Sequence, residues 1–535
     1  MLRSLTQRAR TEPLTALAWL VVLTACVWPL WAANLLPFMD LPQHLATVRV
    51  LHSYGDPLWG VSHYFAIDLG RTQYLAWYFL VDWLTYLMPL ETAARVVFSL
   101  YAVGLPLAPA ALLRAHGRDA RGALLAAPLV YNPFLFMGFA NYVTALPLLL
   151  WALALLQRLL DDFSPRQLFL LTLVATLLFY DHAQAFVLYG ALAGLTVLLG
   201  ARGLAPRHWW RQVAHLIPAG LAMAWWLQQS LLLAGADEWH KGLGGRNVAP
   251  ADVRFKPLLE RLTAFPEFLL DAYPDDADEK VLVAWLFLLG LLWVIGRPAA
   301  TVRPLAGRAA LRRHVPEALL VAAFFIYLLS PISYKWIWPI ADRLVPAVAL
   351  LALPALARPS TPLRSVTLVI PATLLALGMA HLHADRARQF AAEAGPIRQI
   401  LGHADRGKRL MSLIYQPQSR VLKWPAFLHF GQYYTMDRGG VANFSFANFP
   451  QSPVLFPDEG GPPKVPPRFE WTPELFTMAD HGYWYDYVLV RDADPLRRPF
   501  GAAADRVQLV AHDGPWALYR NLGRSDHPPP GAVQQ

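Results

Sequence analysis

The chain has 535 residues, of which 56% are hydrophobic and only 16% are charged. Ordinary soluble domains carry roughly 25% charged residues, so this composition excludes them and indicates a polytopic membrane protein. The formal net charge of +9 would suit a nucleic-acid-binding protein. However, the Lys and Arg residues form short clusters between apolar runs, which is typical of cytoplasmic membrane loops, and we expect no nucleic acid among the partners. The single cysteine, Cys26, excludes an intramolecular disulfide.

The first apolar run, from Leu14 to Leu36, follows a short basic segment with Arg3, Arg8 and Arg10. The run is long enough to span a bilayer. Because positive residues stay on the cytoplasmic side, we expect the N-terminus in the cytoplasm. The run is longer than the apolar part of a usual signal peptide, so the sequence favours an uncleaved anchor.

Directly after this run lies the stretch from Pro37 to Ala46, with the sequence PFMDLPQHLA. Asp40 and His44 are four residues apart and would share one face of a helix if Pro42 sits in its first turn. The pair would then emerge at the external membrane surface. Asp40 could serve there as a catalytic group or as the cap of the helix that begins at Leu41, and the sequence leaves both roles open.

Apolar runs continue along the chain as far as His381. One of them, Tyr74 to Leu90, could cross the membrane or lie in its interface, because it is rich in Trp and Tyr and contains Asp82. The other runs cover residues 93–113, 123–139, 142–156, 168–180, 183–199, 213–233, 281–295, 318–329, 344–356 and 365–381.

The basic loops decide between two topologies. The loops 114–121, 202–211 and 297–313 are all cytoplasmic if 74–90 does not cross and if 168–199 forms two helices that meet at Asp181 and His182. This arrangement gives about eleven crossings and places the C-terminus outside. The rival topology makes 74–90 a span and 168–199 one kinked helix, and it leaves a basic loop on the wrong side.

Polar residues gather at the external ends of these helices under the preferred topology. Ionisable groups at membrane depth are costly and suggest a functional site, so we expect an outward-facing pocket. Lys335 could instead be an interfacial anchor, and Asp342 with Arg343 could be an ordinary ion pair or present the arginine to a phosphate. Beside Asp40 and His44, the candidates are Asn141, Tyr142, Asp181, His182, Gln184, Tyr334, Lys335, Asp342 and Arg343.

The composition changes after His381, where acids, amides and prolines become frequent. The sequence predicts a helix over 386–403 and short strands over 409–415, 487–491, 507–510 and 516–519. The last two strands flank Asp513-Gly514 and read as a hairpin. We expect a small α/β domain outside the membrane over 385–524, and a disordered tail over 525–535 with three consecutive prolines.

The whole arrangement resembles the GT-C superfamily of membrane glycosyltransferases that use polyprenyl-phosphate sugars. Asp40 in Asp40-Leu-Pro-Gln-His44 stands where that superfamily carries its catalytic acid. Three further stretches are similar to bacterial members without an assigned substrate. These stretches are Gly138-Phe-Ala-Asn141-Tyr142, Asp181-His182-Ala-Gln-Ala-Phe186 and Asp342-Arg343. The resemblance implies a GT-C-like transmembrane domain over 1–384.

The resemblance also implies a reaction. A sugar would pass from the lipid phosphate to an extracytoplasmic glycan, lipid or protein, with inversion at the anomeric carbon. Asp40 would act as the base and His44 would orient it, while Arg343 and Lys335 would contact the phosphate and His182 would help to close the site. Asp40 lacks a neighbouring acid, so a possible divalent cation stays open as a cofactor. We expect a multi-pass protein of the inner cell membrane, with membrane lipid and the donor as its partners and its protein partners unknown.

Two other classes remain open. A transporter or flippase for a lipid-linked or anionic solute would place its ionisable residues along a path through the membrane. A non-catalytic assembly protein would tolerate substitution of Asp40 and His44. The clustering of charges at one face favours the enzyme. Neither a phosphate-binding glycine-rich loop nor a His-Glu-x-x-His motif occurs in the sequence.

Overall fold

The computed structural model describes residues 12–201, 209–234, 253–295, 307–334, 337–356, 362–449, 451–457, 467–492 and 499–526. Lys335 and most of the predicted tail, 527–535, lie outside these residues. The chain divides into two compact units. Unit 1 comprises residues 1–34, 96–224 and 250–388, and unit 2 comprises residues 35–95, 225–249 and 389–535. Three helices each cross a boundary between the units in sequence: α5 (Leu90–Ala115), α11 (Ile217–Ala234) and α19 (Pro362–Ala394).

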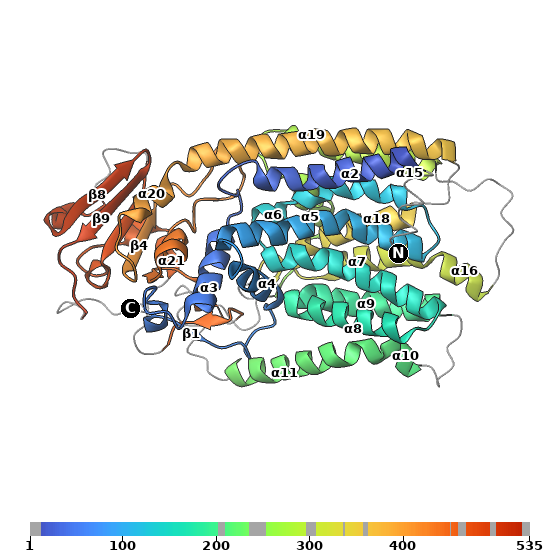
Figure 1. Cartoon of the computed structure of the whole chain (residues 1–535), viewed down its shortest axis with the longest axis horizontal. Coiled ribbons are helices and arrows are strands. Elements are labelled where there is room, and N and C mark those ends of the chain that lie inside the picture. Colours follow the sequence, from blue (N-terminus) through green and yellow to red (C-terminus); the bar gives the residue numbers. More distant parts are fainter. Residues whose placement is uncertain are drawn as a thin grey trace. The chain divides into compact units, whose positions relative to one another are not determined.

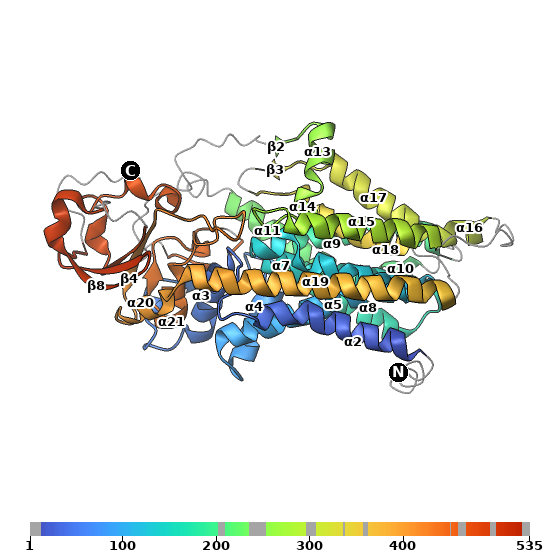
Figure 2. The same ribbon diagram turned by 90° about the horizontal axis from the view of Figure 1, so that it is seen from above.

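Unit 1 is mostly a bundle of helices whose axes run in nearly the same direction (Figures 1 and 2). In both views α19 lies alongside α2. The helices are α2 (Pro13–Val27), α5 (Leu90–Ala115), α6 (Pro133–Phe136), α7 (Ala140–Asp161), α8 (Pro165–Asp181), α9 (Ala183–Gly200), α10 (Trp209–Val213), α11 (Ile217–Ala234), α13 (Leu258–Ala264), α14 (Glu267–Leu270), α15 (Ala277–Ile295), α16 (Arg308–Arg313), α17 (Val315–Leu329), α18 (Val345–Leu356) and α19 (Pro362–Ala394). A short antiparallel pair joins β2 (Val253–Arg254) to β3 (Ser333–Tyr334).

Five helices in the described part of the chain are long and apolar enough to cross a membrane. They cover Pro13–Trp31, Leu90–Ala115, Ala140–Asp161, Ala183–Gly200 and Thr367–Ala394. The first of these continues α2 through a 3₁₀ turn at Trp28–Trp31. The fold therefore has the helical, membrane-type character that the composition predicted.

The predicted break in the 168–199 run is confirmed. α8 ends at Asp181 and α9 begins at Ala183, with His182 between them in an extended conformation. The main chain thus leaves helical geometry at the one point of this run where two ionisable residues stand. α7, which carries Asn141 and Tyr142 in its first turn, packs against both α8 and α9.

The run 123–139 differs from a regular spanning helix. Residues Ala120–Tyr131 form a 3₁₀ helix, and only Pro133–Phe136 form α6. Pro128 and Pro133 lack the backbone N–H of an α-helix, and the side chain of Asn132 accepts from Phe134 N and starts the new turn. Every residue from 122 to 131 is buried, so this segment belongs to the interior of unit 1.

Unit 2 contains a five-stranded mixed sheet in the order β5-β4-β7-β9-β8. β4 (Arg409–Ile414) pairs in parallel with β5 (Val441–Ala442) and β7 (Tyr487–Arg491), while β9 (Trp516–Asn521) is antiparallel to β7 and β8 (Val507–Asp513). This sheet confirms the predicted strands and the hairpin around Gly514. The helices of unit 2 are α3 (Leu41–Ser53), α4 (Ala76–Thr85), α20 (Ile397–Gly402) and α21 (Gln432–Arg438).

Residues 35–95 share the hydrophobic core of the C-terminal sheet. Val50 of α3 and Phe65 are buried with Met411 of β4 and Val488 of β7. β1 (Ala66–Ile67) pairs with β6 (Val454–Leu455), and α21 packs on α3. Residues 35–95 and 389–535 of unit 2 therefore share one hydrophobic core.

Two boundaries differ from the sequence-based expectation. α19 continues to Ala394, so residue 385 lies inside a helix, and the predicted helix 386–403 is divided between α19 and α20. Within 74–90, the helix α4 has only 10 residues. A straight span needs about 20 residues, so α4 fits the topology in which this run does not cross.

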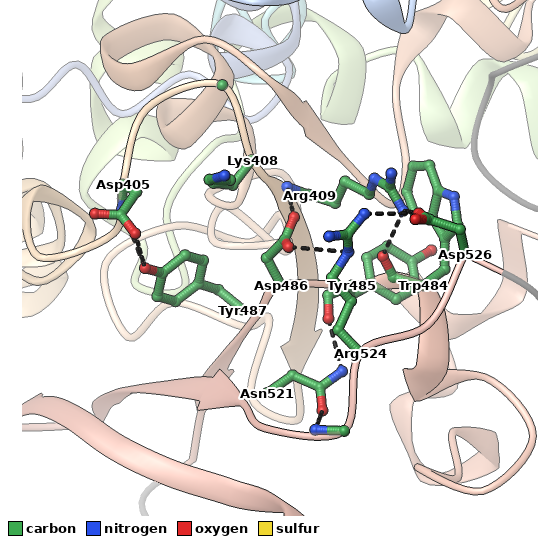
Figure 3. A network of polar contacts seen from close by, with 12 residues as sticks. Asp405, Lys408, Arg409, Trp484, Tyr485, Asp486, Tyr487, Asn521, Arg524 and Asp526 are labelled. Atoms are coloured by element: carbon green, nitrogen blue, oxygen red, sulfur yellow. Dashed lines mark hydrogen bonds and ion pairs between the residues drawn. The ribbon is translucent and has the colours of Figure 1, made fainter.

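A network of ion pairs fixes the chain after β9 (Figure 3). Arg409, at the start of β4, lies 2.8 Å from Asp526, and Arg524 lies 3.2 Å from Asp486, the residue before β7. The backbone N–H of Arg409 also donates to Asp486 Oδ2 at 2.9 Å. These contacts hold the final segment against two central strands.

Candidate active site

Asp40 is the residue that precedes α3, with Pro42 in the first turn of the helix. The helix starts where the Asp-Leu-Pro pattern predicts, because proline lacks only a hydrogen bond that the first turn would not make. The side chain of Asp40 makes no capping hydrogen bond. The carboxylate is thus held at the helix start for contacts other than the cap.

Asp40 contacts His429, a residue that the sequence analysis did not select. Asp40 Oδ1 lies 3.2 Å from His429 Nε2. The other ring nitrogen, Nδ1, is hydrogen-bonded to Glu470 Oε1. All three residues belong to unit 2. Asp40, His429 and Glu470, which we call the acid-histidine triad, place one imidazole between two carboxylates.

The ring of His429 is fixed by apolar and amide contacts. It stacks on Phe444 with ring centroids 5.6 Å apart and meets Phe446 edge-on at 5.9 Å. Gln43, one turn into α3, accepts the backbone N–H of Phe446 with Oε1 at 3.0 Å, and its Nε2 lies 3.2 Å from His429 Nδ1. Position and orientation of the imidazole are therefore determined from three sides.

Burial and charge set the protonation of the triad. His429 is 6% and Glu470 is 4% exposed. Burial alone would lower the pKa of the His429 imidazole, but the carboxylates of Glu470 and Asp40 outweigh burial and raise this pKa to about 10. Burial raises the pKa of Glu470, and the His429 cation opposes that rise. His429 is therefore a cation at neutral pH.

His44, the predicted partner of Asp40, contacts another element. Its Nδ1 lies 2.7 Å from the hydroxyl of Tyr78 on α4. The ring packs edge-on against Phe446 with centroids 5.3 Å apart. Since Phe446 also touches His429, the two histidines share one aromatic neighbour, and the histidine that meets Asp40 is His429.

Unit 1 holds a second polar group, around the start of α7. The Tyr142 hydroxyl donates to the backbone carbonyl of Arg343, and the Tyr142 ring meets His182 edge-on at 5.2 Å. The guanidinium of Arg343 lies over the Phe139 ring at 4.6 Å, and its Nη2 donates to Trp338 O at 3.3 Å. The structure thus brings together three of the predicted residues, Tyr142, His182 and Arg343, which we call the arginine cluster.

Several buried side-chain atoms of unit 1 have no hydrogen-bond partner among the described residues. Asp181 Oδ1 and Asn141 Nδ2 are two of them, and both residues are buried. Buried polar atoms are nearly always paired, so an unpaired acceptor and an unpaired donor mark a place where a ligand or water can bind.

The remaining predicted residues are placed separately. Gln184 Nε2 donates to Ile340 O at 2.7 Å, and Tyr334 is an exposed residue of β3. Asp342 is 1% exposed, and its Oδ2 is buried without a partner in the described part of the chain. Whether Asp342 and Arg343 form an ordinary ion pair or present the arginine to a phosphate stays a prediction.

One acidic group among the described residues has metal-ligand spacing. The carboxylates of Asp271, Asp278 and Glu279 lie within 4.8 Å of one another in unit 1. Asp278 Oδ2 already accepts the backbone N–H groups of Ala272 and Tyr273, at 2.5 and 3.1 Å. Asp278, in the first turn of α15, therefore binds the backbone that precedes the helix, and a cation is not required to account for its position.

His429 and Glu470 were missed because no local pattern marks them. His429 lies in Phe427-Leu-His-Phe430, and Glu470 ends a 3₁₀ helix at Pro467–Glu470. The available signal was an ionisable residue enclosed by aromatic residues in both segments. Their partner, however, lies in α3, and that pairing requires the fold.

No protein-family model and no curated protein matches this sequence. Among solved structures, the chain is similar to ArnT from Cupriavidus metallidurans in the apo state, with TM-score 0.54 and 12% identity over 97% of this chain and 99% of that one. The same protein bound to undecaprenyl phosphate gives TM-score 0.54 and 13% identity, over 96% and 98%. The oligosaccharyltransferase of Archaeoglobus fulgidus gives TM-score 0.43 and 11% identity, over 82% and 65%. The likeness to ArnT covers both units, and the chain therefore has the same overall fold as ArnT.

Proposed function

We propose that this protein is a GT-C-type glycosyltransferase that moves a sugar from a polyprenyl-phosphate donor to an extracytoplasmic acceptor. The observation that carries the proposal is the state of Asp40. Its Oδ1 is held by His429, and among the described residues Oδ2 makes no hydrogen bond or ion pair. The side chain remains 12% exposed. One oxygen of a fixed carboxylate is thus open to a substrate hydroxyl.

The reaction assigned to this site is an inverting displacement. The acceptor oxygen bonds to the anomeric carbon while the bond from that carbon to the phosphate oxygen breaks. Asp40 Oδ2 takes the proton of the acceptor hydroxyl, as a general base. The polyprenyl phosphate leaves with the electron pair, and a cation near its oxygens stabilises it.

The arginine cluster is the proposed phosphate site. Arg343 offers a planar guanidinium, which suits phosphate better than a point charge. Asp181 and Asn141 have the unpaired buried atoms, and we assign them to the sugar or the phosphate. ArnT binds undecaprenyl phosphate in a structure with the same fold, which supports a polyprenyl lipid as the donor here.

The proposal also includes the location of the protein in a membrane and the side on which each part lies. The apolar helices require a membrane. We assign the N-terminus to the cytoplasm from its arginines, and the sheet of unit 2 to the extracytoplasmic side of the inner membrane. The acceptor would then be a glycan, lipid or protein of the cell envelope.

The test is sugar transfer in membranes that contain the full-length protein. The donors are radiolabelled polyprenyl-phosphate hexoses and pentoses, and the variants are Asp40→Asn and Asp82→Asn at matched expression. Asp82 is a suitable control because it is also a carboxylate of unit 2 paired with a histidine, His52, at 2.8 Å. We expect transfer to disappear in Asp40→Asn and to persist in Asp82→Asn. Equal transfer by all three proteins would refute Asp40 as the base, and donor binding without any transfer would favour a transporter.

A further inference from the structure

We propose that His429 and Glu470 are positioning residues for Asp40, and that Glu470 prevents the histidine cation from weakening Asp40 as a base. This inference rests on the proposed function and deepens it. It concerns two residues that do not touch the substrate hydroxyl in the proposed reaction, and it assigns each of them a different task.

The first task is orientation. The Nε2–H of His429 donates to Asp40 Oδ1, with the two atoms 3.2 Å apart. Phe444 and Phe446 pack against the ring and Glu470 accepts its Nδ1–H, so the imidazole that faces Asp40 is held in place. Base catalysis requires the accepting oxygen within about 2.6–3.2 Å of the proton donor. A carboxylate free to rotate would spend only part of its time in that geometry.

The second task is charge balance. A single cation beside Asp40 would stabilise the carboxylate and make it a poorer proton acceptor. Glu470 supplies a second carboxylate on the far nitrogen of the same ring. When both carboxylates are ionised, the three groups together carry a charge of −1. Burial raises the pKa of Glu470 to about 7, so the full charge is reached above that pH. In serine-protease triads a buried acid orients the histidine that acts as the base. Here the buried acid Glu470 would orient His429, and Asp40 would act as the base.

The surroundings contain few other charges that could replace this effect. The charged groups that act on the His429 ring are Asp40, from the start of α3, and Glu470, from the helix Pro467–Glu470. The other contacts described above are uncharged. The nearby titratable groups on α3 and α4 are His44 and Tyr78, which bond to each other.

The experiment combines activity with a direct measurement of the histidine charge. The variants are His429→Gln, His429→Ala, Glu470→Gln and, as control, His52→Gln. Glutamine can still donate a hydrogen bond toward Asp40 but carries no charge. His52 is a matched control, because it is a partly buried histidine of α3 paired with a carboxylate.

The activity measurement is the kcat and KM of sugar transfer against pH, in purified full-length protein. We expect His429→Ala to lower kcat about 100-fold with KM changed less than threefold, and His429→Gln to recover at least a tenth of the wild-type kcat. Glu470→Gln should lower kcat about tenfold and shift the acidic limb of the pH profile to lower pH. These changes are of the size that general bases and their positioning contribute. If the substitutions raised KM and lowered thermal stability in parallel, and if His429→Gln recovered no kcat, the two residues would have a merely structural role.

The charge measurement is carbon-13 NMR of labelled histidine side chains in the detergent-solubilised protein. The His429 signal is assigned from its absence in His429→Gln. We expect His429 to stay protonated through pH 8 in the wild type and to titrate at lower pH in Glu470→Gln. A neutral His429 at pH 7 in the wild type would overturn the inference. Absence of transfer by the wild type with every donor would refute the proposed function instead, and the NMR result would still decide the charge of the triad.

Discussion

Asp40 Oδ1 and His429 Nε2 lie 3.2 Å apart, although one residue follows the first apolar helix and the other belongs to the C-terminal part of the chain. This contact makes the N-terminal loop and the C-terminal sheet parts of one catalytic arrangement within unit 2. The predictions below test that arrangement, the arginine cluster and the packing that holds unit 2 together.

Stability should depend on the charge of His429. The folded-state pKa of His429 is raised to about 10, above the ordinary value of 6.5. A raised pKa means that the ion pairs stabilise the fold fully below about pH 6.5, and that this contribution declines as pH rises through 10. We expect the Tm of the wild type to fall more steeply between pH 7 and 10 than the Tm of His429→Gln. Equal slopes in thermal unfolding would contradict the assigned charge.

Gln43 should be required for both stability and activity. Its Oε1 accepts the N–H of Phe446 at 3.0 Å, and Gln43→Leu leaves that partly buried group without this partner. Such a loss costs about 1–3 kcal/mol. We expect a lower Tm and reduced transfer. The exposed Gln399→Leu in α20 is the control, with no change in Tm expected, and a tolerated Gln43→Leu would show that Gln43 does not hold the ring of His429.

The sequence predicted the elements of this protein better than the contacts between them. The break at Asp181 and His182 was predictable because a carboxylate inside the mostly apolar run 168–199, of 32 residues, conflicts with a continuous membrane helix. The hairpin at Asp513-Gly514 follows from turn chemistry. Neither rule indicates that α3 meets the segment around His429, because that pairing depends on tertiary packing between distant parts of the chain.

The candidate site shows the same division. Asp40 was found because it follows the first apolar run and matches a family pattern. His44 was selected with it from helical spacing, which places residues on one face but does not determine what packs there. In the structure His44 contacts the hydroxyl of Tyr78, and His429, from the C-terminal part of the chain, contacts Asp40.

Asp181 should be dispensable for folding but required for binding of the polyprenyl phosphate. Its buried Oδ1 has no partner among the described residues, and a buried unpaired oxygen costs free energy. We therefore expect Asp181→Leu to leave Tm unchanged or higher, and to weaken binding of undecaprenyl phosphate measured by native mass spectrometry. Asp278→Leu is the contrast, because Asp278 Oδ2 accepts two backbone N–H groups and its loss should lower Tm. A lower Tm in Asp181→Leu with unchanged lipid binding would assign Asp181 to the fold.

Arg343 should act on donor binding rather than on the chemical step. Its guanidinium lies over Phe139, and lysine cannot reproduce the planar stacking or the paired hydrogen bonds to phosphate. We expect Arg343→Lys to raise the KM for the lipid donor about tenfold, equivalent to about 1.4 kcal/mol, with kcat nearly unchanged. The exposed Arg313→Lys serves as the control. A fall in kcat at constant KM would show that Arg343 stabilises the transition state and does not act on donor binding.

Gly440 should be more sensitive to substitution than Gly514, another glycine of unit 2 with a positive φ. The φ of Gly440 is +64°, its N–H donates to Trp59 O at 2.8 Å, and a Cβ there would collide with the carbonyl oxygen of Lys408. Gly514 has a φ of +55° with nothing near its Cβ position, so Gly514→Ala measures the backbone strain alone, about 1 kcal/mol. We expect Gly440→Ala to lower the free energy of unfolding by clearly more than Gly514→Ala, because the steric clash adds to the strain. Sugar transfer should also fall in Gly440→Ala, because the hydrogen bond from Gly440 to Trp59 joins residues 35–95 to the part of unit 2 that carries His429. Equal effects of the two substitutions in denaturant unfolding would show that this junction adjusts without loss.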